Sequence, residues 1–195
     1  TNCGFGSNIS PKAELLSRLT SAQSTLTLND NSVSKFERNK LINKIFGNSI
    51  KNTFKISNLD FIENTEEIKS TASHNGYEKN FGCIYKRKIS INKSTKNLSG
   101  CDELIKKKDG KPINYSLRFH LYPGLSAIKT MGGNSVLIQL SKNKSLLFTI
   151  ANESVLVEKS IFLGGNKILN NVCIVISGEL INEDKEIKWE IKKNI

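Results

Sequence analysis

Short segments in which apolar and polar residues alternate dominate the second half of the chain. Residues 115–121 alternate in this way, and Pro123-Gly124 then marks a turn. Residues 125–130 and 135–140 flank Met131-Gly132-Gly133-Asn134, a loop typical of a β-hairpin. Similar segments follow at residues 146–150, 155–157, 160–163, 172–177 and 187–191. Short strands at roughly 8–12-residue spacing, divided by turn residues, predict a sandwich or barrel.

The first half of the chain is less regular. Ser10 and Pro11 suit the cap and the first position of a helix that we expect to run to about Leu19. Residues 24–28 alternate and predict a half-buried strand, whereas the polar residues 29–52 predict a surface excursion. Within it, residues 40–46 favour a helical turn or two, and strand patterns return at residues 53–57, 67–72 and 83–91. We therefore expect one all-β domain over residues 1–195, an antiparallel β-sandwich with a short N-terminal helix.

The length and the start of the chain restrict its class. A chain of 195 residues fits one domain, and no apolar run approaches the roughly 18–20 residues that span a bilayer. The chain opens on Thr1-Asn2-Cys3-Gly4, with no initiator Met and no signal-type segment. We expect the C-terminal part of a longer protein, with no membrane span.

The formal net charge of +11 raises the question of an anionic partner. Lys accounts for 25 of the 29 basic residues, and only Lys106-Lys107-Lys108, which we expect in a solvated loop, is a run. Nucleic-acid binding would rest on charge alone, because basic residues interleaved with aromatic ones are missing. We therefore expect no nucleic-acid partner. An acidic polysaccharide would be attracted by the same charge.

The four cysteines and the two histidines are the other chemically distinctive residues. The cysteines lie far apart with no CxxC pair, which excludes the usual zinc modules. Cys83 and Cys173 lie in apolar strand segments and are expected as buried free thiols, with one or two disulfides as the alternative. His74 lies in a polar turn next to Gly76, which admits close backbone approach. It is a site candidate or an ordinary turn residue.

His120 lies in a predicted strand. Alternation places Arg118, His120 and Tyr122 on one face, with Phe119 and Leu121 on the other. The three polar side chains either line a sugar groove or form a solvated face.

Several ordered motifs resemble the heparinase II/III-like family, in its α-proteobacterial form. The family patterns "R.T.AHST", "HDGY…FG..H.RR", "L.GED.L", "RFHLHPG", "S.YLG" and "I.W" correspond to segments that start at Arg18, His74, Leu98, Arg118, Ser160 and Ile187. The resemblance covers nearly the whole chain, and the motifs are specific together rather than singly. It implies the C-terminal β-sandwich of an enzyme whose N-terminal helical toroid is absent from this chain.

The resemblance also implies a reaction and a set of site residues. Family members cleave uronate-containing polysaccharides by β-elimination, using a Tyr and an Asn or His from the toroid and a His from the sandwich. It therefore implies an acidic polysaccharide as partner, a periplasmic location, and an inactive fragment when the toroid is missing. His74 and Gln23, which stands at a family His position, are the catalytic candidates. Arg118, His120, Tyr122 and Tyr77 are the substrate-binding candidates.

Departures from the family pattern restrict what can be expected. Gln23 stands where "AHST" has its His, and Gln can hydrogen-bond a carboxylate but cannot shuttle a proton near neutral pH. Either catalysis depends on the toroid, or the domain is a non-catalytic carbohydrate-binding or structural module. Some family members hold a structural zinc. With Gln23 and only two His we expect no metal or other cofactor, and His74 would be the ligand if zinc were bound.

Three aromatic and basic residues have a structural alternative. Arg118 either binds a uronate carboxylate or pairs with Asp102 or Glu103. Tyr77 either stacks on a sugar ring or packs beneath its loop. Trp189 is expected in the core.

Overall fold

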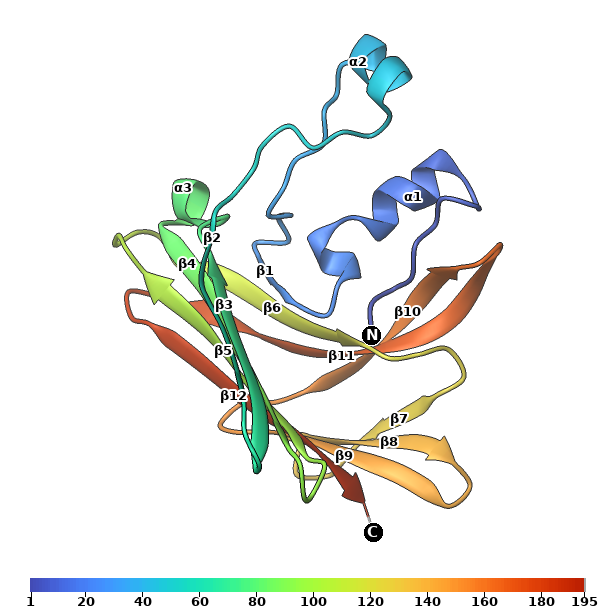
Figure 1. Ribbon diagram of the computed structural model, residues 1–195, viewed down its shortest axis with the longest axis vertical. Helices are drawn as coiled ribbons and strands as arrows, with labels where there is room; N and C mark the ends of the chain where they lie inside the picture. Colours follow the sequence, from blue (N-terminus) through green and yellow to red (C-terminus); the bar gives the residue numbers. More distant parts are fainter. Residues whose placement is uncertain (195) are drawn as a thin grey trace.

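The fold is an antiparallel β-sandwich with short helices gathered at one end, the upper end in Figure 1. The computed structural model describes residues 1–194. The helical elements are α1 (Pro11–Ser17), the 3₁₀ turn η1 (Thr20–Ala22), α2 (Lys40–Phe46) and α3 (Glu78–Phe81). The strands are β1 (Leu26–Leu28), β2 (Ile56–Glu63), β3 (Glu67–His74), β4 (Cys83–Asn92), β5 (Leu98–Lys106), β6 (Ile113–His120), β7 (Ser126–Lys129), β8 (Ser135–Ser141), β9 (Lys144–Ile150), β10 (Leu156–Gly164), β11 (Lys167–Leu180) and β12 (Lys185–Asn194).

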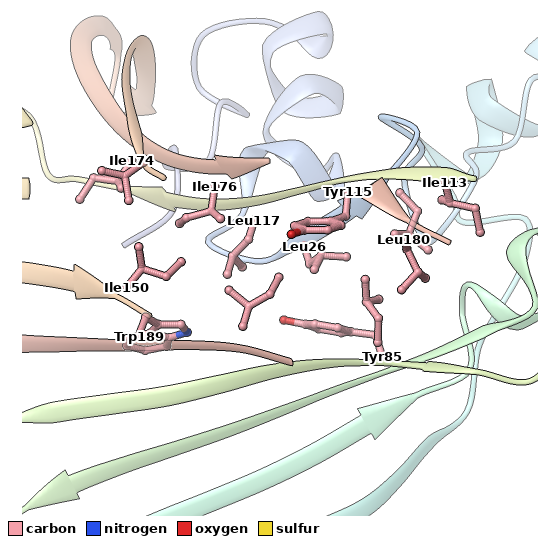
Figure 2. Packing of buried hydrophobic residues seen from close by; sticks show 14 of the residues in the cluster. Leu26, Tyr85, Ile113, Tyr115, Leu117, Ile150, Ile174, Ile176, Leu180 and Trp189 are labelled. Atoms are coloured by element: carbon pink, nitrogen blue, oxygen red, sulfur yellow. The ribbon is translucent and has the colours of Figure 1, made fainter. Parts of the chain in front are cut away.

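The strands form two sheets. The four-stranded sheet has the order β1-β6-β11-β10, and the eight-stranded sheet has the order β2-β3-β4-β5-β12-β9-β8-β7. Side chains from the two inner faces meet in one apolar core: Leu117, Ile174 and Ile176 come from the smaller sheet, and Ile150 and Trp189 from the larger (Figure 2). The predicted sandwich is thus confirmed, with Trp189 in its core. No helix among the described residues is long and apolar enough to cross a membrane.

Most local predictions are confirmed. Ser10 caps α1 by accepting a hydrogen bond from the Ala13 amide at 3.1 Å, and α2 occupies the stretch expected to be helical. Two predicted strands, residues 155–157 and 160–163, form the single strand β10. The strand expected at residues 53–57 begins only at Ile56 and runs to Glu63.

One strand prediction was wrong and one strand was not predicted, each for an identifiable reason. β1 is buried on both faces, because Thr27 on its outer side accepts a hydrogen bond from Arg118 at 2.8 Å. The residue pattern does not indicate β5, because Gly, Asp and Glu are disfavoured in strands. Gly100 occurs there because the Trp189 ring lies directly against its Cα, where a Cβ would collide with it.

A buried polar network joins three strands of the larger sheet. The Asp102 carboxylate is fully buried and accepts hydrogen bonds from Arg87 Nε (2.7 Å), Trp189 Nε1 (2.7 Å) and the Tyr85 hydroxyl. A second nitrogen of Arg87 donates to the Ser24 carbonyl at 2.5 Å. A buried carboxylate needs such partners, so the network fixes β4, β5 and β12 relative to the segment before β1.

All four cysteines are free thiols. Cys3, Cys83 and Cys173 are buried and Cys101 is partly exposed. This confirms the expectation for Cys83 and Cys173.

Candidate functional site

A hollow of about 310 Å³ lies where η1, the excursion and the end of β3 meet. Its polar lining includes Arg18, Gln23 and His74, and its apolar lining includes Phe36 and Phe54. The structure therefore brings together the two residues predicted as catalytic, although His74 ends β3 of the larger sheet and Gln23 follows η1, outside both sheets.

His74 closes β3 and is set among aromatic rings. Its ring centroid lies 5.1 Å from that of Phe54, 5.7 Å from Tyr77 and 5.2 Å from Tyr85. The Gly76 amide donates a hydrogen bond to His74 Nδ1 at 3.2 Å, which places the proton of the neutral ring on Nε2. Burial lowers the pKa of His74. His74 is therefore a neutral hydrogen-bond donor near pH 7, with no partner for Nε2 among the described residues.

Gly76 allows the excursion to close over this turn. A Cβ at Gly76 would overlap the Val33 side chain, and Val33 itself lines the hollow. The close approach expected at Gly76 is confirmed, and it is the excursion that makes it.

Gln23 is held by its own neighbours. Its Nε2 donates to the Ser17 carbonyl at 2.8 Å, and its Oε1 accepts a hydrogen bond from Asn2 at 3.2 Å. One N–H of the amide remains available to a ligand. Gln23 thus fixes the N-terminal segment against α1 and leaves a single donor at the hollow.

Arg18 and Phe54 were not predicted as site residues. Arg18 Nη1 donates to the Asn48 carbonyl at 2.6 Å and pairs with Glu14 at 3.4 Å, and the guanidinium lies 4.9 Å from the ring centroid of Phe36. Its Nε and Nη2 have no hydrogen-bond partner among the described residues. The signal for Arg18 was present, because it opens the same motif that contains Gln23. Phe54 carried no signal, because it lies in an irregular stretch before β2.

One of the aromatic rings packed on His74, that of Tyr85, belongs to the buried Asp102 network. Tyr85, which packs on His74, bonds to Asp102, and Arg87 bonds to both Asp102 and the carbonyl next to Gln23. The same carboxylate thus supports the His74 ring and the backbone beside Gln23.

The four predicted substrate-binding residues do not line this hollow. Arg118 bonds to Thr27 and pairs with Asp30 at 3.3 Å, so the expected partners Asp102 and Glu103 were wrong. His120 is only 5% exposed and bonds to the Ser21 carbonyl at 2.9 Å, so the solvated-face alternative was wrong for it.

Tyr77 and Tyr122 have opposite environments. Tyr77 is 1% exposed and its hydroxyl donates to the Leu26 carbonyl at 2.8 Å, which is the packing alternative and leaves no face for a sugar ring. Tyr122 lies beyond the end of β6, is largely exposed, and packs against Phe162 with ring centroids 5.6 Å apart. A ligand role for Tyr122 stays a prediction.

The hollow does not suit a zinc ion. Among residues 1–194, the only cluster of three side chains that could hold a metal is Cys101, Glu103 and Glu186, and it does not include His74. Glu103 in that cluster is already paired with Lys86 (3.3 Å) and Lys88. Among the described residues that line the hollow, no second His, Cys, Asp or Glu accompanies His74.

Solved structures share this fold. The heparan sulfate lyase HepC from Pedobacter heparinus aligns over 93% of this chain and 25% of its own, with TM-score 0.72 and 14% identity. The heparinase III BT4657 gene product aligns over 94% of this chain and 25% of its own, with TM-score 0.68 and 11% identity. A structure titled heparinase III aligns over 94% of this chain and 25% of its own, with TM-score 0.64 and 13% identity. This chain thus spans a quarter of the length of each.

The sequence comparisons differ in outcome. A search of curated proteins gives no match. The family model "Heparinase II/III-like, C-terminal" matches residues 1–190. The motifs, the two-sheet fold and this match agree, and the chain belongs to the heparinase II/III-like C-terminal domain family.

Proposed function

We propose that this chain is the substrate-facing β-sandwich of a lyase that cleaves uronate-containing polysaccharides by β-elimination. The observation that carries the proposal is the hollow in which Arg18, Gln23 and His74 converge. These three side chains offer hydrogen-bond donors of the kind that a carboxylate accepts, and Arg18 is a permanent cation.

The donors suit the difficult step of this reaction. β-Elimination removes the proton at C5, next to the uronate carboxylate, before the C4–oxygen bond breaks. Donors placed on the carboxylate withdraw its negative charge and stabilise the charge that develops as the proton leaves. The His74 Nε2–H, the free N–H of Gln23 and the unpaired nitrogens of Arg18 would share that work.

His74 is better suited to this role than to that of the base. The Gly76 amide occupies Nδ1, so the neutral ring offers a donor and not a lone pair to the hollow. Protonation would put two N–H groups against each other at Nδ1. We therefore assign the base and the proton donor for the leaving sugar to the N-terminal domain found in longer family members.

The test uses a longer protein that contains this domain. Unsaturated uronate is followed by absorbance with heparan sulfate, alginate and other polyuronates. We expect product from at least one of them, a loss of roughly 100-fold in kcat/KM for His74→Ala, and a smaller loss for His74→Gln, which keeps a donor. Absence of product from all of them, or an unaffected His74→Ala enzyme, would refute the proposal. The 195-residue chain alone is expected to release no product.

A second function is favoured by Gln23. Its amide is engaged on both sides, as befits a structural residue, and the family pattern has His in that position. A non-catalytic carbohydrate-binding module would keep the hollow without the reaction. Gln23→His in the longer protein separates the two: activity gained only in the variant supports a module that has lost catalysis, whereas an active wild type supports the lyase.

We also propose a periplasmic location, as the family resemblance suggests. Fractionation of the natural host, with detection by an antibody to this domain, tests it.

A further inference from the structure

We propose that a lysine-lined cleft next to the His74 hollow binds the acidic polysaccharide chain on one side of the cleaved residue. This inference rests on the proposed function and adds to it the surface along which the chain extends. We name the cleft formed by the excursion, the turn after β3 and α3 the lysine cleft.

The lysine cleft adjoins the hollow. It measures about 860 Å³, and Phe54 lines both it and the hollow. At its other end Lys79, Asn80, Gly82 and Lys108 also line a further groove of about 390 Å³, which extends toward the start of β6. Figure 1 shows α1, α2 and α3 together at this end of the sandwich. Three adjoining depressions suit a linear ligand of several sugar units better than a single small molecule.

The charge in the cleft is positive and largely unneutralised. Lys35, Lys51, Lys79, Lys107 and Lys108 line it, with Glu78 as its acidic residue. Among these lysines, only Lys51 pairs with an acid within the described part of the chain, Glu37 at 3.8 Å. Lys106 and Lys111 line the further groove, together with the acidic residues Glu78 and Asp109. An anionic chain would therefore meet four lysines, Lys35, Lys79, Lys107 and Lys108, that form no ion pair within the described part of the chain.

Lysines without acidic partners are not a general feature of the depressions on this surface. A depression of about 460 Å³ on the outer face of the larger sheet is also lined by lysines. There Lys69 pairs with Glu67, Lys88 with Glu103, and Lys188 with Glu186 at 2.8 Å. Its positive charge is cancelled locally, so we do not propose an anion site there.

The rim of the lysine cleft is fixed by the backbone. The Lys51 amide donates to the Lys35 carbonyl at 2.8 Å, and the Lys35 amide donates to Asn52 Oδ1 at 2.6 Å. On the opposite rim the Lys107 amide donates to the Gly82 carbonyl at 2.7 Å. The lysines are thus presented from anchored segments, which lowers the entropic cost of binding.

A polysaccharide fits this surface better than nucleic acid does. Single-stranded nucleic acid is held by successive aromatic platforms, and Phe54 is the only aromatic residue that lines the cleft. Carboxylate and sulfate groups spaced along a sugar chain need cations without stacking. Phe54, at the junction with the hollow, offers one apolar surface to a sugar ring.

The test compares two triple variants of the 195-residue chain. K79Q/K107Q/K108Q removes three cations from the lysine cleft, and K142Q/K144Q/K167Q removes three exposed lysines from the β8–β9 and β10–β11 turns. Both lower the formal net charge of +11 by three, and the control residues line none of the three depressions. Binding of heparan sulfate disaccharide and octasaccharide is measured by calorimetry over a salt series. Circular dichroism confirms that each variant is folded.

We expect the cleft variant to bind the octasaccharide about tenfold more weakly, since each exposed ion pair contributes roughly a factor of two. Its salt dependence should become shallower, the disaccharide should change less, and the control should bind as the wild type does. Equal losses in both triple variants would refute the cleft, and so would equal affinity for a DNA duplex of the same charge.

Failure of the cleft and failure of the lyase assignment remain distinguishable. In the longer protein, His74→Ala tests the reaction whatever happens at the lysines. Loss of turnover in His74→Ala with no effect of the cleft variant on KM would refute the cleft alone.

Discussion

Replacement of Gly100 by Ala tests how the polar network and the core depend on each other. A Cβ at Gly100 would overlap Cζ2 and Cε2 of Trp189 and lie 2.8 Å from Cη2. The ring is held on its other sides by Phe119, with centroids 4.9 Å apart, and by the hydrogen bond from Nε1 to Asp102 at 2.7 Å. The ring therefore cannot move away without losing packing or that bond.

The magnitude follows from these contacts. Overpacking of a core costs about 1–3 kcal/mol, and weakening a hydrogen bond to a buried carboxylate costs up to about 1.5–3 kcal/mol. We expect Gly100→Ala to lower the free energy of unfolding by about 3 kcal/mol. With an m-value of about 2 kcal/mol/M, the urea midpoint falls by about 1.5 M.

The assay is favourable because Trp189 is the only tryptophan. Urea unfolding followed by its fluorescence reports global stability, and the native emission reports the ring's surroundings. Gly110→Ala is the matched control, because no atom lies within 4 Å of a Cβ built there. It should change stability by no more than about 0.5 kcal/mol.

A double variant identifies the collision as the cause. Trp189→Phe removes the atoms that a Cβ at Gly100 would meet, so Gly100→Ala should cost at least about 1 kcal/mol less in that background, as measured by circular dichroism. The reasoning is refuted if Gly100→Ala is as stable as Gly110→Ala with unchanged native emission.

Three further outcomes are expected. Asp102→Asn should lower the free energy of unfolding by about 3 kcal/mol, because Arg87 then loses its charged partner at a buried site. Urea unfolding measures this loss against the exposed control Glu186→Gln, whose stability should change little. Burial lowers the pKa of His74 below its ordinary 6.5, so below pH 6.5 the unfolded chain binds more protons than the folded chain and the free energy of unfolding falls. His74→Gln should reduce this loss of stability between about pH 6.5 and 5. A pH profile of stability that is unchanged in the variant would contradict the prediction. Burial raises the pKa of Cys173 to about 12 and also raises the pKa of Cys3 and Cys83. A thiol reagent at neutral pH should therefore modify at most Cys101 in the folded chain. Rapid reaction of more than one thiol would be inconsistent with the fold.

The sequence predicts the sandwich because its strands have one buried and one polar face. Alternation between Arg118 and Phe119 states which side chain enters the core, and the structure agrees. β5 does not follow this pattern, because the residue types of Gly100 and Asp102 are set by Trp189 on another strand. The Trp189 ring packs against Gly100, and its Nε1 donates to Asp102. A pattern within one segment carries no trace of a partner 87 residues away.

The candidate site was predictable to the extent that motifs name its residues. The resemblance indicated His74 and Gln23, and the structure places both at one hollow. It also singled out His120, which is instead buried against the Ser21 carbonyl. Whether a polar strand face is solvated depends on which distant segment covers it, and here the N-terminal segment covers it: the Thr1 amino group bonds to the His120 carbonyl at 3.0 Å.

The hollow and the lysine cleft should therefore tolerate substitution differently. His74 packs on Tyr85, and Tyr85 bonds to Asp102, which also holds Trp189 and Arg87. A change at any of these positions alters the core as well as the site, so its effects on stability and binding should appear together. The lysines of the cleft lie on surface segments, and within the described part of the chain they form no ion pair with a member of that network. Their replacement should change affinity and its salt dependence while leaving the urea midpoint in place, and that separation distinguishes a surface that binds a chain from a pocket that the fold itself holds in position.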